Sequence, residues 1–303
     1  MRYLITGTNG FIGRSLVARL CEDPNNQIFA VDLSFDKLVN QPNIVKMPAD
    51  LLLTDGKKFP DVDCVVHAAA LLGVDFVEKN PVRTLLDNVG MFSPLTKYVD
   101  NGNLRFVFFS TSEAYGDGRR DDGKGNTKNT ENDPSIHLNL PNLQDPRSSY
   151  PISKIVGEFI ANQFKNSICL RPHNIYGPQM GDRHVMPQLI SKIRLAKDDN
   201  SVSLYNPTHT RSFCLINDAI EQIIHWIESD VVGPINIGNP TEPITIEKLF
   251  EMLANKMNKH LLIEQEDKHL TSPQFRKPKM PVDNFVYTPL SEGLDKMIAS
   301  YGE

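Results

Sequence analysis

Residues 2–13 have the sequence RYLITGTNGFIG. An apolar run suited to a buried strand leads into a GxxGxxG pattern, Gly7, Gly10 and Gly13, and a helical pattern follows over 11–21. Glycine permits a tight turn, close approach of a diphosphate and packing of the helix on the strand, while the helix N-terminus favours anions. The stretch therefore predicts a dinucleotide-binding turn.

Asp32 supports this prediction. It ends a second predicted strand, 27–31, about 20 residues beyond the loop, where a carboxylate accepts hydrogen bonds from ribose hydroxyls. Its charge would repel a 2′-phosphate, so we predict NAD rather than NADP. Taken alone, Asp32 is also compatible with a simple turn cap.

The rest of the chain predicts an α/β protein with a Rossmann-type, doubly wound parallel sheet and a smaller C-terminal α/β substrate domain. We assign 1–171, with parts of 211–240, to the NAD-binding domain, and 172–210 with 240–303 to the second. The predicted strands of the first half are 2–6, 27–31, 43–47, 62–66, 105–110 and 167–170, and its helices 11–21, 81–100 and 149–165. The second half predicts helices at 185–197, 218–228, 245–257 and 291–299, and strands at 202–204, 211–215 and 234–237.

Composition narrows the class. The 303 residues carry a net charge of −5 without a long Lys/Arg run, so neither a nucleic-acid nor a membrane partner is expected. The longest apolar stretch, 64–74, is too short to span a bilayer. Four scattered cysteines lack CxxC spacing, which argues against a metal site and a disulfide framework. We expect a cytoplasmic protein that begins directly with its first strand.

Two segments carry candidate chemistry. Tyr150 and Lys154 lie four residues apart on a predicted helix, where an ammonium favours a nearby phenolate. A Ser/Thr-rich segment, 110–116, follows the 105–110 strand at the sheet edge where ligands bind. A chance pair on an amphipathic helix and a polar strand cap are the plain alternatives.

The polar segment 117–147 is typical either of a functional lid or of a solvated insert.

Together these segments resemble the extended short-chain dehydrogenase/reductase family, and within it the NAD-dependent nucleotide-sugar epimerase/dehydratase branch. The resemblance rests on the glycine loop, Asp32, the YxxxK pair and several further motifs. These are His67-Ala68-Ala69-Ala70, STSEAYG over 110–116, RPHNIYGP over 171–178, Arg211-Ser212-Phe213 with Asp218, INIG over 235–238 and Arg276-Lys277-Pro278.

The resemblance implies a role for each matched residue. The cofactor would be NAD, held by Gly7, Asn9, Gly10, Phe11, Ile12, Gly13, Asp32, Asp50, Leu51, Ala68, Ala69, Ala70, Tyr150 and Lys154. The catalytic residues would be Thr111, Tyr150, Lys154 and Glu113. The substrate, a nucleotide sugar and by expectation UDP-linked, would contact Ser112, Asn174, Arg211 and Arg276, although a solvated Arg276 is the alternative. The helices 81–100 and 149–165 resemble those that pair in homodimers.

The family reaction begins with oxidation of the sugar at C4 to a 4-keto intermediate. Dehydratases of the family usually carry Asp-Glu after the Thr, whereas Ser112 stands here in place of the Asp. The Thr-Ser-Glu order and the late Arg resemble decarboxylases acting on UDP-glucuronate, but the stretch 180–184 does not. A 4-epimerase is the first expectation, then the decarboxylase and the 4,6-dehydratase. The non-enzyme alternative is an NAD-sensing scaffold, against which the retained Thr111, Tyr150 and Lys154 argue.

Overall fold

The computed structural model describes residues 1–115, 119–121, 127–129, 142–197, 200–266, 275–281 and 284–301. Contacts among them divide the chain into two compact units. Unit one comprises the described residues within Met1–Ala114, Leu140–Pro172 and Ile220–Ile235, and unit two those within Tyr115–Asn139, His173–Ala219 and Asn236–Glu303. No helix in these ranges is long and apolar enough to cross a membrane.

Unit one is built on a seven-stranded sheet with the order β13-β8-β5-β4-β1-β2-β3. The neighbouring pairs from β3 to β8 are parallel, which confirms the predicted doubly wound sheet. Every residue of β4 and β5 is buried, as expected of strands covered by helices on both faces. The strands are β1 (Arg2–Thr6), β2 (Gln27–Asp32), β3 (Ile44–Pro48), β4 (Cys64–His67), β5 (Arg105–Phe109), β8 (Ser167–Pro172) and β13 (Gly233–Ile237).

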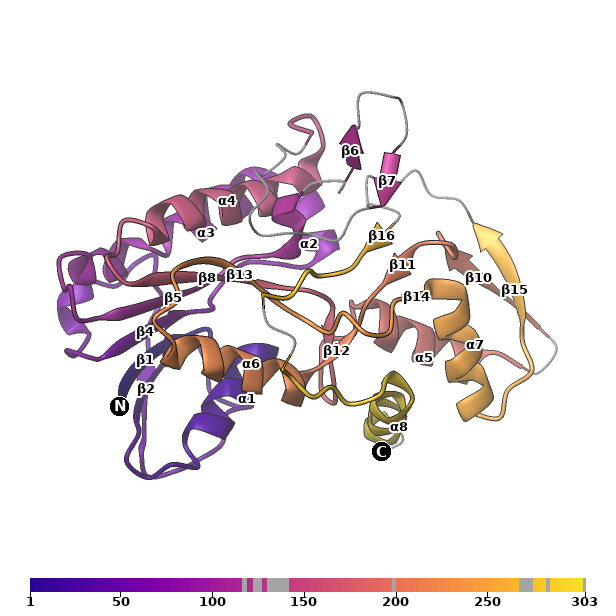
Figure 1. Ribbon diagram of the computed structural model, residues 1–303, viewed down its shortest axis with the longest axis horizontal. Coiled ribbons are helices and arrows are strands. Elements are labelled where there is room, and N and C mark those ends of the chain that lie inside the picture. Colours follow the sequence, from indigo (N-terminus) through magenta and orange to yellow (C-terminus); the bar gives the residue numbers. More distant parts are fainter. Residues whose placement is uncertain are drawn as a thin grey trace. The chain divides into compact units, whose positions relative to one another are not determined.

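Helices cover both faces of this sheet: α1 (Phe11–Leu20) and α6 (Ile216–Glu228) on one, α3 (Pro81–Gly90) and α4 (Ser149–Ala161) on the other (Figure 1). The predicted single helix 81–100 is wrong. It ends at Gly90 because Pro94 lacks an amide donor and its ring clashes with the carbonyl four residues earlier, and a 3₁₀ helix, Ser93–Tyr98, follows. The short helix α2 (Val74–Lys79) was not predicted, and α4 ends four residues before the predicted 165.

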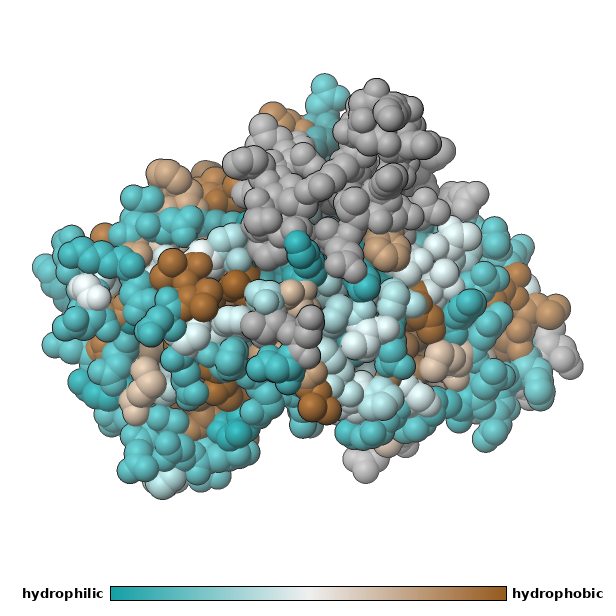
Figure 2. Space-filling model, viewed as in Figure 1, coloured by the Kyte–Doolittle hydropathy of each residue, from teal (hydrophilic) through white to brown (hydrophobic). Residues whose placement is uncertain are grey.

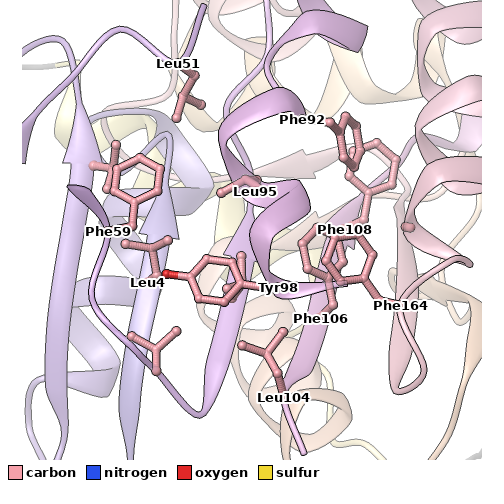
Figure 3. Packing of buried hydrophobic residues seen from close by; sticks show 14 of the residues in the cluster. Leu4, Leu51, Phe59, Phe92, Leu95, Tyr98, Leu104, Phe106, Phe108 and Phe164 are labelled. Carbon is pink, nitrogen blue, oxygen red and sulfur yellow. The ribbon is translucent and has the colours of Figure 1, made fainter. Parts of the chain in front are cut away.

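The face covered by α3 and α4 holds an aromatic core (Figure 3). The rings of Phe106 and Phe164 stack with their centroids 3.8 Å apart, and Phe92 packs against Phe108 at 5.0 Å. Gly157 lets α4 descend onto this cluster, since a Cβ there would lie 2.4 Å from Cζ of Phe108. The close packing fixes the height of α4 above β5.

Arg105 fastens the amino end of β5. Its guanidinium is buried and donates to Asn166 Oδ1 at 2.5 Å, to the Trp226 carbonyl at 2.8 Å and to the Val231 carbonyl at 2.7 Å. One side chain thereby joins β5 to the turn before β8 and to the C-terminal end of α6. These contacts lie at the opposite end of β5 from Thr111.

Unit two consists of small sheets and three helices. The predicted strand 211–215 is two strands, β11 and β12, in different sheets, because residues 212 and 213 interrupt the pairing. Within the segment 117–147, the structure describes a short antiparallel pair and the residues from 142 onward, so the lid prediction lies largely outside the described residues. The elements are β6 (Arg119–Asp121), β7 (Thr127–Asn129), β9 (Ile175–Tyr176), α5 (Val185–Leu195), β10 (Ser201–Tyr205), β11 (Thr210–Arg211), β12 (Cys214–Leu215), β14 (Ile244–Thr245), α7 (Ile246–Lys256), β15 (Leu262–Glu266), β16 (Phe275–Arg276) and α8 (Leu290–Ser300).

Candidate active site

The glycine loop joins β1 to α1 in unit one. Gly7 has φ +75°, and a Cβ on it would lie 2.6 Å from the Ala69 nitrogen. A Cβ on Gly13 would lie 2.1 Å from the Gly7 carbonyl oxygen, so the helix can approach the strand only with glycine there. Gly10 is the N-cap of α1 and, without a side chain, leaves the first amides of the helix, at Phe11, Ile12 and Gly13, uncapped by it. This arrangement fits a dinucleotide diphosphate.

Asp32 lies beside the loop. Its Oδ2 accepts from the Asn9 backbone amide at 2.8 Å, and its Oδ1 from the Leu33 amide at 2.7 Å. The Asn9 side chain in turn donates to Ser34 Oγ at 2.9 Å and Asp36 Oδ1 at 2.8 Å. Asp36 is therefore a second carboxylate tied to the glycine loop, which the sequence analysis did not single out. Two negative charges here favour NAD over NADP, because they repel the 2′-phosphate on the ribose of NADP.

The segment after β4 is held against β1. The Ala68 amide donates to the Thr6 carbonyl at 3.2 Å and the Ala69 amide to Thr6 Oγ1 at 3.3 Å. Thr6 Oγ1 also bonds His67 Nδ1 at 2.8 Å. Burial, and then the charge of Lys154, lower the pKa of His67 to about 3, so this imidazole is neutral. Residues 68–70 are partly exposed, as a cofactor lining requires.

Of the two residues predicted to border the adenine, Leu51 has its side chain buried in the core of unit one. Any ligand contact by Leu51 would therefore come mainly from its backbone. Asp50 is partly exposed, and its Oδ1 accepts from the Leu52 amide at 2.9 Å. The adenine-binding roles of both residues remain predictions.

Tyr150, Lys154 and Thr111 meet where α4 passes the carboxyl end of β5. The Thr111 side chain lies close enough to the Tyr150 hydroxyl to lower its pKa. The Lys154 ammonium donates to the Phe109 carbonyl at 2.8 Å and lies 4.9 Å from the ring centroid of Phe108 and 5.8 Å from that of Tyr150. The structure thus brings the Tyr150–Lys154 pair together with Thr111, which the sequence placed on a separate segment.

Burial dominates the electrostatics of this cluster. It lowers the pKa of Lys154 to about 7. Burial, and then the charge of Glu113, raise the pKa of Tyr150, while the Thr111 side chain lowers it. Without a cofactor, desolvation of the phenolate therefore outweighs the effect of Lys154 on the pKa of Tyr150. The positive charge of an oxidised nicotinamide is what could reverse this balance.

Glu113 and Ser112 belong to a short 3₁₀ helix, Ser112–Tyr115, that follows Thr111. The Glu113 amide donates to Thr111 Oγ1 at 3.2 Å, and the Glu113 carboxylate is close enough to Tyr150 to raise its pKa. Ser112 is buried. A carboxylate, a hydroxyl and a phenol are therefore gathered at one edge of the sheet, as general acid–base chemistry requires.

Asn88 is a residue of this region that the sequence analysis missed. Its buried amide on α3 accepts from the Leu71 amide at 2.7 Å and donates to the Leu71 carbonyl and to Ser153 Oγ, both at 3.1 Å. It thereby ties the segment after Ala70 to the helical turn between Tyr150 and Lys154. The available signal was a lone asparagine on the inner face of an apolar helix.

The predicted phosphate ligands lie together in unit two. Arg211 and Arg276 are direct partners on the parallel strands β11 and β16. Burial, and then the charge of Arg276, lower the pKa of Arg211 to about 9, so both guanidinium groups are positively charged at neutral pH. Asn174, at φ 42°, donates to the Ser212 carbonyl at 3.0 Å, next to Arg211. Paired guanidinium groups suit a diphosphate.

Unit two also contains a buried polar cluster formed by three of the matched motifs. Asn236 Oδ1 accepts from the Tyr115 hydroxyl at 2.8 Å and lies 3.1 Å from His173 Nε2, and Asn236 Nδ2 donates to the Lys279 carbonyl at 2.9 Å. The cluster holds Tyr115, just after Glu113, to the start of the N-x-G motif.

Across the described ranges, no group of three or more His, Cys, Asp or Glu is placed to hold a metal ion.

Comparison with known proteins identifies the family of this chain. The model of the NAD dependent epimerase/dehydratase family matches residues 3–238. UDP-glucuronic acid decarboxylases 5 and 6 of Arabidopsis thaliana are 30% and 28% identical to this chain, over 92% of it and 81% and 80% of their own lengths. The solved structure of UDP-glucuronic acid 4-epimerase from Bacillus cereus, with UDP-glucuronic acid and NAD, is similar with a TM-score of 0.82 at 22% identity, covering 100% of this chain and 99% of that one.

A Rossmann-type sheet with a glycine loop and a Tyr–Lys pair defines a nicotinamide-dependent enzyme. The chain belongs to the NAD dependent epimerase/dehydratase family. This confirms the predicted family, the predicted enzyme class and NAD as its cofactor. The roles of individual residues remain predictions, and two of them can be tested on this geometry.

The first concerns Asp32. Replacing Asp32 with Ala removes the carboxylate beside the loop and should reduce the preference for NAD over NADP. We expect this mainly because the affinity for NAD falls. Titrating both cofactors into the apo protein by calorimetry or fluorescence measures the two dissociation constants. The matched control is Asp23→Ala, an exposed carboxylate in the loop before β2. If the unmodified protein bound NADP as well as NAD, Asp32 would not be the selecting residue.

The second concerns Tyr150 and Lys154. Tyr150→Phe should lower turnover at least about 100-fold, the effect of losing an acid–base group, and leave NAD affinity within a few-fold. Lys154→Ala should lower both turnover and NAD affinity, because it also removes the cation expected to hold the nicotinamide ribose. Steady-state kinetics and NAD titration separate the two effects. Retention of most activity by Tyr150→Phe would show that the base lies elsewhere.

Proposed function

We propose that this enzyme modifies a UDP-sugar through a 4-keto intermediate and that its reaction is decarboxylation of UDP-glucuronate. The observation that carries the proposal is Glu113, whose carboxylate lies near enough to Tyr150 to raise its pKa. The Thr-Ser-Glu order and the late Arg276 match the decarboxylases, and relatives at 28–30% identity bear that name. This support reverses the order of the first two reactions expected from the sequence.

The proposed reaction gives a role to each residue of the site. When bound, NAD accepts hydride from C4 of the sugar and later returns it. Tyr150, beside Thr111, removes the proton of the C4 hydroxyl. The resulting 4-keto uronate is a β-keto acid, so its C5–C6 bond breaks as carbon dioxide leaves, and the electron pair passes to the C4 oxygen. Tyr150 and Thr111 stabilise that oxygen by hydrogen bonds. The Glu113 carboxylate then relays a proton from water to C5 as the electron pair returns from the C4 oxygen, which restores the 4-ketone.

The phosphate ligands of the substrate are assigned within unit two. Arg211 and Arg276 carry two positive charges on adjacent strands, and Asn174 lies next to Arg211. Because guanidinium groups bind phosphate oxygens in pairs, we assign the UDP diphosphate to them. Ser112 remains a candidate contact for the sugar. We infer a cytoplasmic setting because the four cysteines lack the spacing of a disulfide framework, and three of them, Cys64, Cys169 and Cys214, are buried.

A 4-epimerase is the second candidate. It is favoured by the stretch 180–184, Met-Gly-Asp-Arg-His, which does not resemble the decarboxylases. In an epimerase the ketone is presented to the cofactor by its other face, and no acid or base near C5 is required. The two candidates therefore differ in how strongly they depend on Glu113.

Glu113→Gln tests the proposed reaction. For a decarboxylase we expect about 100-fold loss of turnover, as for a lost acid–base group, whereas an epimerase should keep at least about a tenth. The Glu113 charge raises the pKa of Tyr150, so the variant should also move the Tyr150 limb of the pH–rate profile to lower pH. Incubation with UDP-glucuronate, UDP-hexoses and UDP-N-acetylhexosamines, followed by NMR, identifies the products.

The matched control is Glu221→Gln, which removes an exposed carboxylate of unit one remote from Tyr150 and should leave turnover unchanged. Carbon dioxide and a UDP-pentose from UDP-glucuronate support the first candidate. Formation of a C4 epimer without carbon dioxide would replace it with the second.

We further propose that the enzyme is a homodimer that pairs through α3 and α4. Three large apolar side chains on these adjacent helices are exposed: Val82 by 69%, Leu86 by 63% and Phe159 by 68%. Hydrophobic residues colour the upper left margin of Figure 2, where Figure 1 places the two helices. A second copy of the same face would cover them, as the resemblance implies.

Phe159→Asp should convert this dimer to a monomer, because a carboxylate would be buried without a partner at the interface. Light scattering coupled to size-exclusion chromatography measures the mass. Leu262→Asp is the control, since Leu262 is 64% exposed but lies on β15 of unit two. A monomeric unmodified protein, or a dimer unaffected by Phe159→Asp, would contradict the proposed interface.

A further inference from the structure

The inner face of α4 carries a third polar residue in line with the catalytic pair. Tyr150, Lys154 and Glu158 follow one another at intervals of four residues and so lie on successive turns of one helix face. Each meets the end of β5 at a different residue. Tyr150 lies beside the Thr111 side chain, Lys154 donates to the Phe109 carbonyl, and Glu158 Oε1 accepts from Ser110 Oγ at 2.5 Å.

Glu158 is itself held by a buried arginine. Arg171 donates through Nε to Glu158 Oε1 at 2.8 Å and through Nη2 to Oε2 at 2.7 Å. The two side chains are only 2% and 8% exposed. Arg171 lies on β8, next to Leu170, whose carbonyl accepts from the Ser110 amide at 2.7 Å. The network therefore connects α4, β5 and β8 at one point, one residue before Thr111.

The geometry of this network indicates that it positions α4 rather than adding much to the stability of the fold. A buried ion pair gains little over well-packed apolar residues, because desolvation of both charges opposes their attraction. A bidentate fork and a third hydrogen bond nevertheless fix the carboxylate in angle and position. Apolar packing around Phe108 sets the height of α4 above the sheet, whereas these directed bonds set its position along β5.

We propose that Glu158, oriented by Arg171, is a positioning residue that sets the register of α4 against the end of β5 and so holds Tyr150 beside Thr111. Its readout in turnover rests on the proposed function, but the geometry it maintains does not. A displacement of Tyr150 from Thr111 slows proton removal from the substrate without removing any group that binds it.

Glu158→Gln tests the proposal, because the amide keeps the shape and loses the charge and one acceptor. We expect kcat to fall about 10- to 100-fold, with KM for the UDP-sugar and Kd for NAD within about threefold. Ser110→Ala removes only the hydroxyl donor and should give a several-fold fall in kcat in a chain that folds normally. Arg171→Lys keeps the positive charge but loses the bidentate geometry. Its fall in kcat should lie between those of Glu158→Gln and Ser110→Ala.

Arg105→Lys is the matched control. It disturbs a buried arginine network at the opposite end of the same strand and should lower the melting temperature while leaving kcat unchanged. In a Tyr150→Phe background, Glu158→Gln should cost no further rate in single-turnover reduction of NAD. A further full loss in that background, or an equal fall in kcat for Arg105→Lys, would overturn the positioning role.

A readout without substrate separates this proposal from the proposed function. The tyrosinate absorbance difference between the protein and its Tyr150→Phe variant, with NAD bound, reports the titration of Tyr150 among its charged neighbours Glu113 and Lys154. Glu158→Gln and Ser110→Ala should each shift that titration upward by moving Tyr150 away from Thr111, which lowers its pKa, and Arg105→Lys should not. If Tyr150 titrates identically in all of them, Glu158 does not position it, whichever sugar is the substrate.

Discussion

The close approach of the backbone around Gly7 is the constraint on which the site in unit one depends. A side chain on Gly7 would collide with Ala69, and one on Gly13 with the Gly7 carbonyl. Because Thr6 and His67 are paired in register, the turn after β1 and the segment after β4 begin side by side. The Thr6 hydroxyl then bonds both His67 and the Ala69 amide. The cofactor loop and its neighbouring wall are thus positioned by the same few atoms.

Burial has a common effect on the titratable groups of this site. It lowers the pKa of Lys154 to about 7 and of His67 to about 3, and it raises the pKa of Tyr150. Each shift favours the neutral form of its group. A site that disfavours charge on its own side chains makes ionisation of Tyr150 depend on the charge of what binds there. On the proposed role of Tyr150 as the base, proton removal would depend on the positive charge of a bound, oxidised nicotinamide.

What the sequence could predict follows from how local each signal is. The buried runs of β4 and β5 and the glycine loop depend on neighbouring residues, and these predictions hold. The helix that Pro94 interrupts also carried a local signal, and the longer apolar pattern obscured it. Asp36 and Asn88 could not be found in this way, because their partners, Asn9 and Leu71, are brought to them by the fold.

The shift at Tyr150 was likewise beyond the sequence. Spacing shows that Lys154 shares a helix face with the phenol, but it does not show how much water either group loses. In the structure Lys154 donates to the Phe109 carbonyl and lies nearer the ring centroid of Phe108 than that of Tyr150. Desolvation of the phenolate then exceeds any benefit from the ammonium.

The charge of Glu113 bears on which of the two candidate reactions this site favours. On the proposed roles of Tyr150 and Thr111, oxidation at C4 needs only these two residues and the cofactor, so it is common to both reactions. A uronate brings its own carboxylate to C5, and on the proposed assignment Glu113 lies near it. Two carboxylates at close range raise the energy of the bound uronate, and loss of carbon dioxide relieves the repulsion. An epimerase acting on a uronate would bear that repulsion throughout its cycle with no step to release it. A fixed carboxylate beside Tyr150 therefore fits decarboxylation of a uronate or epimerisation of a neutral sugar.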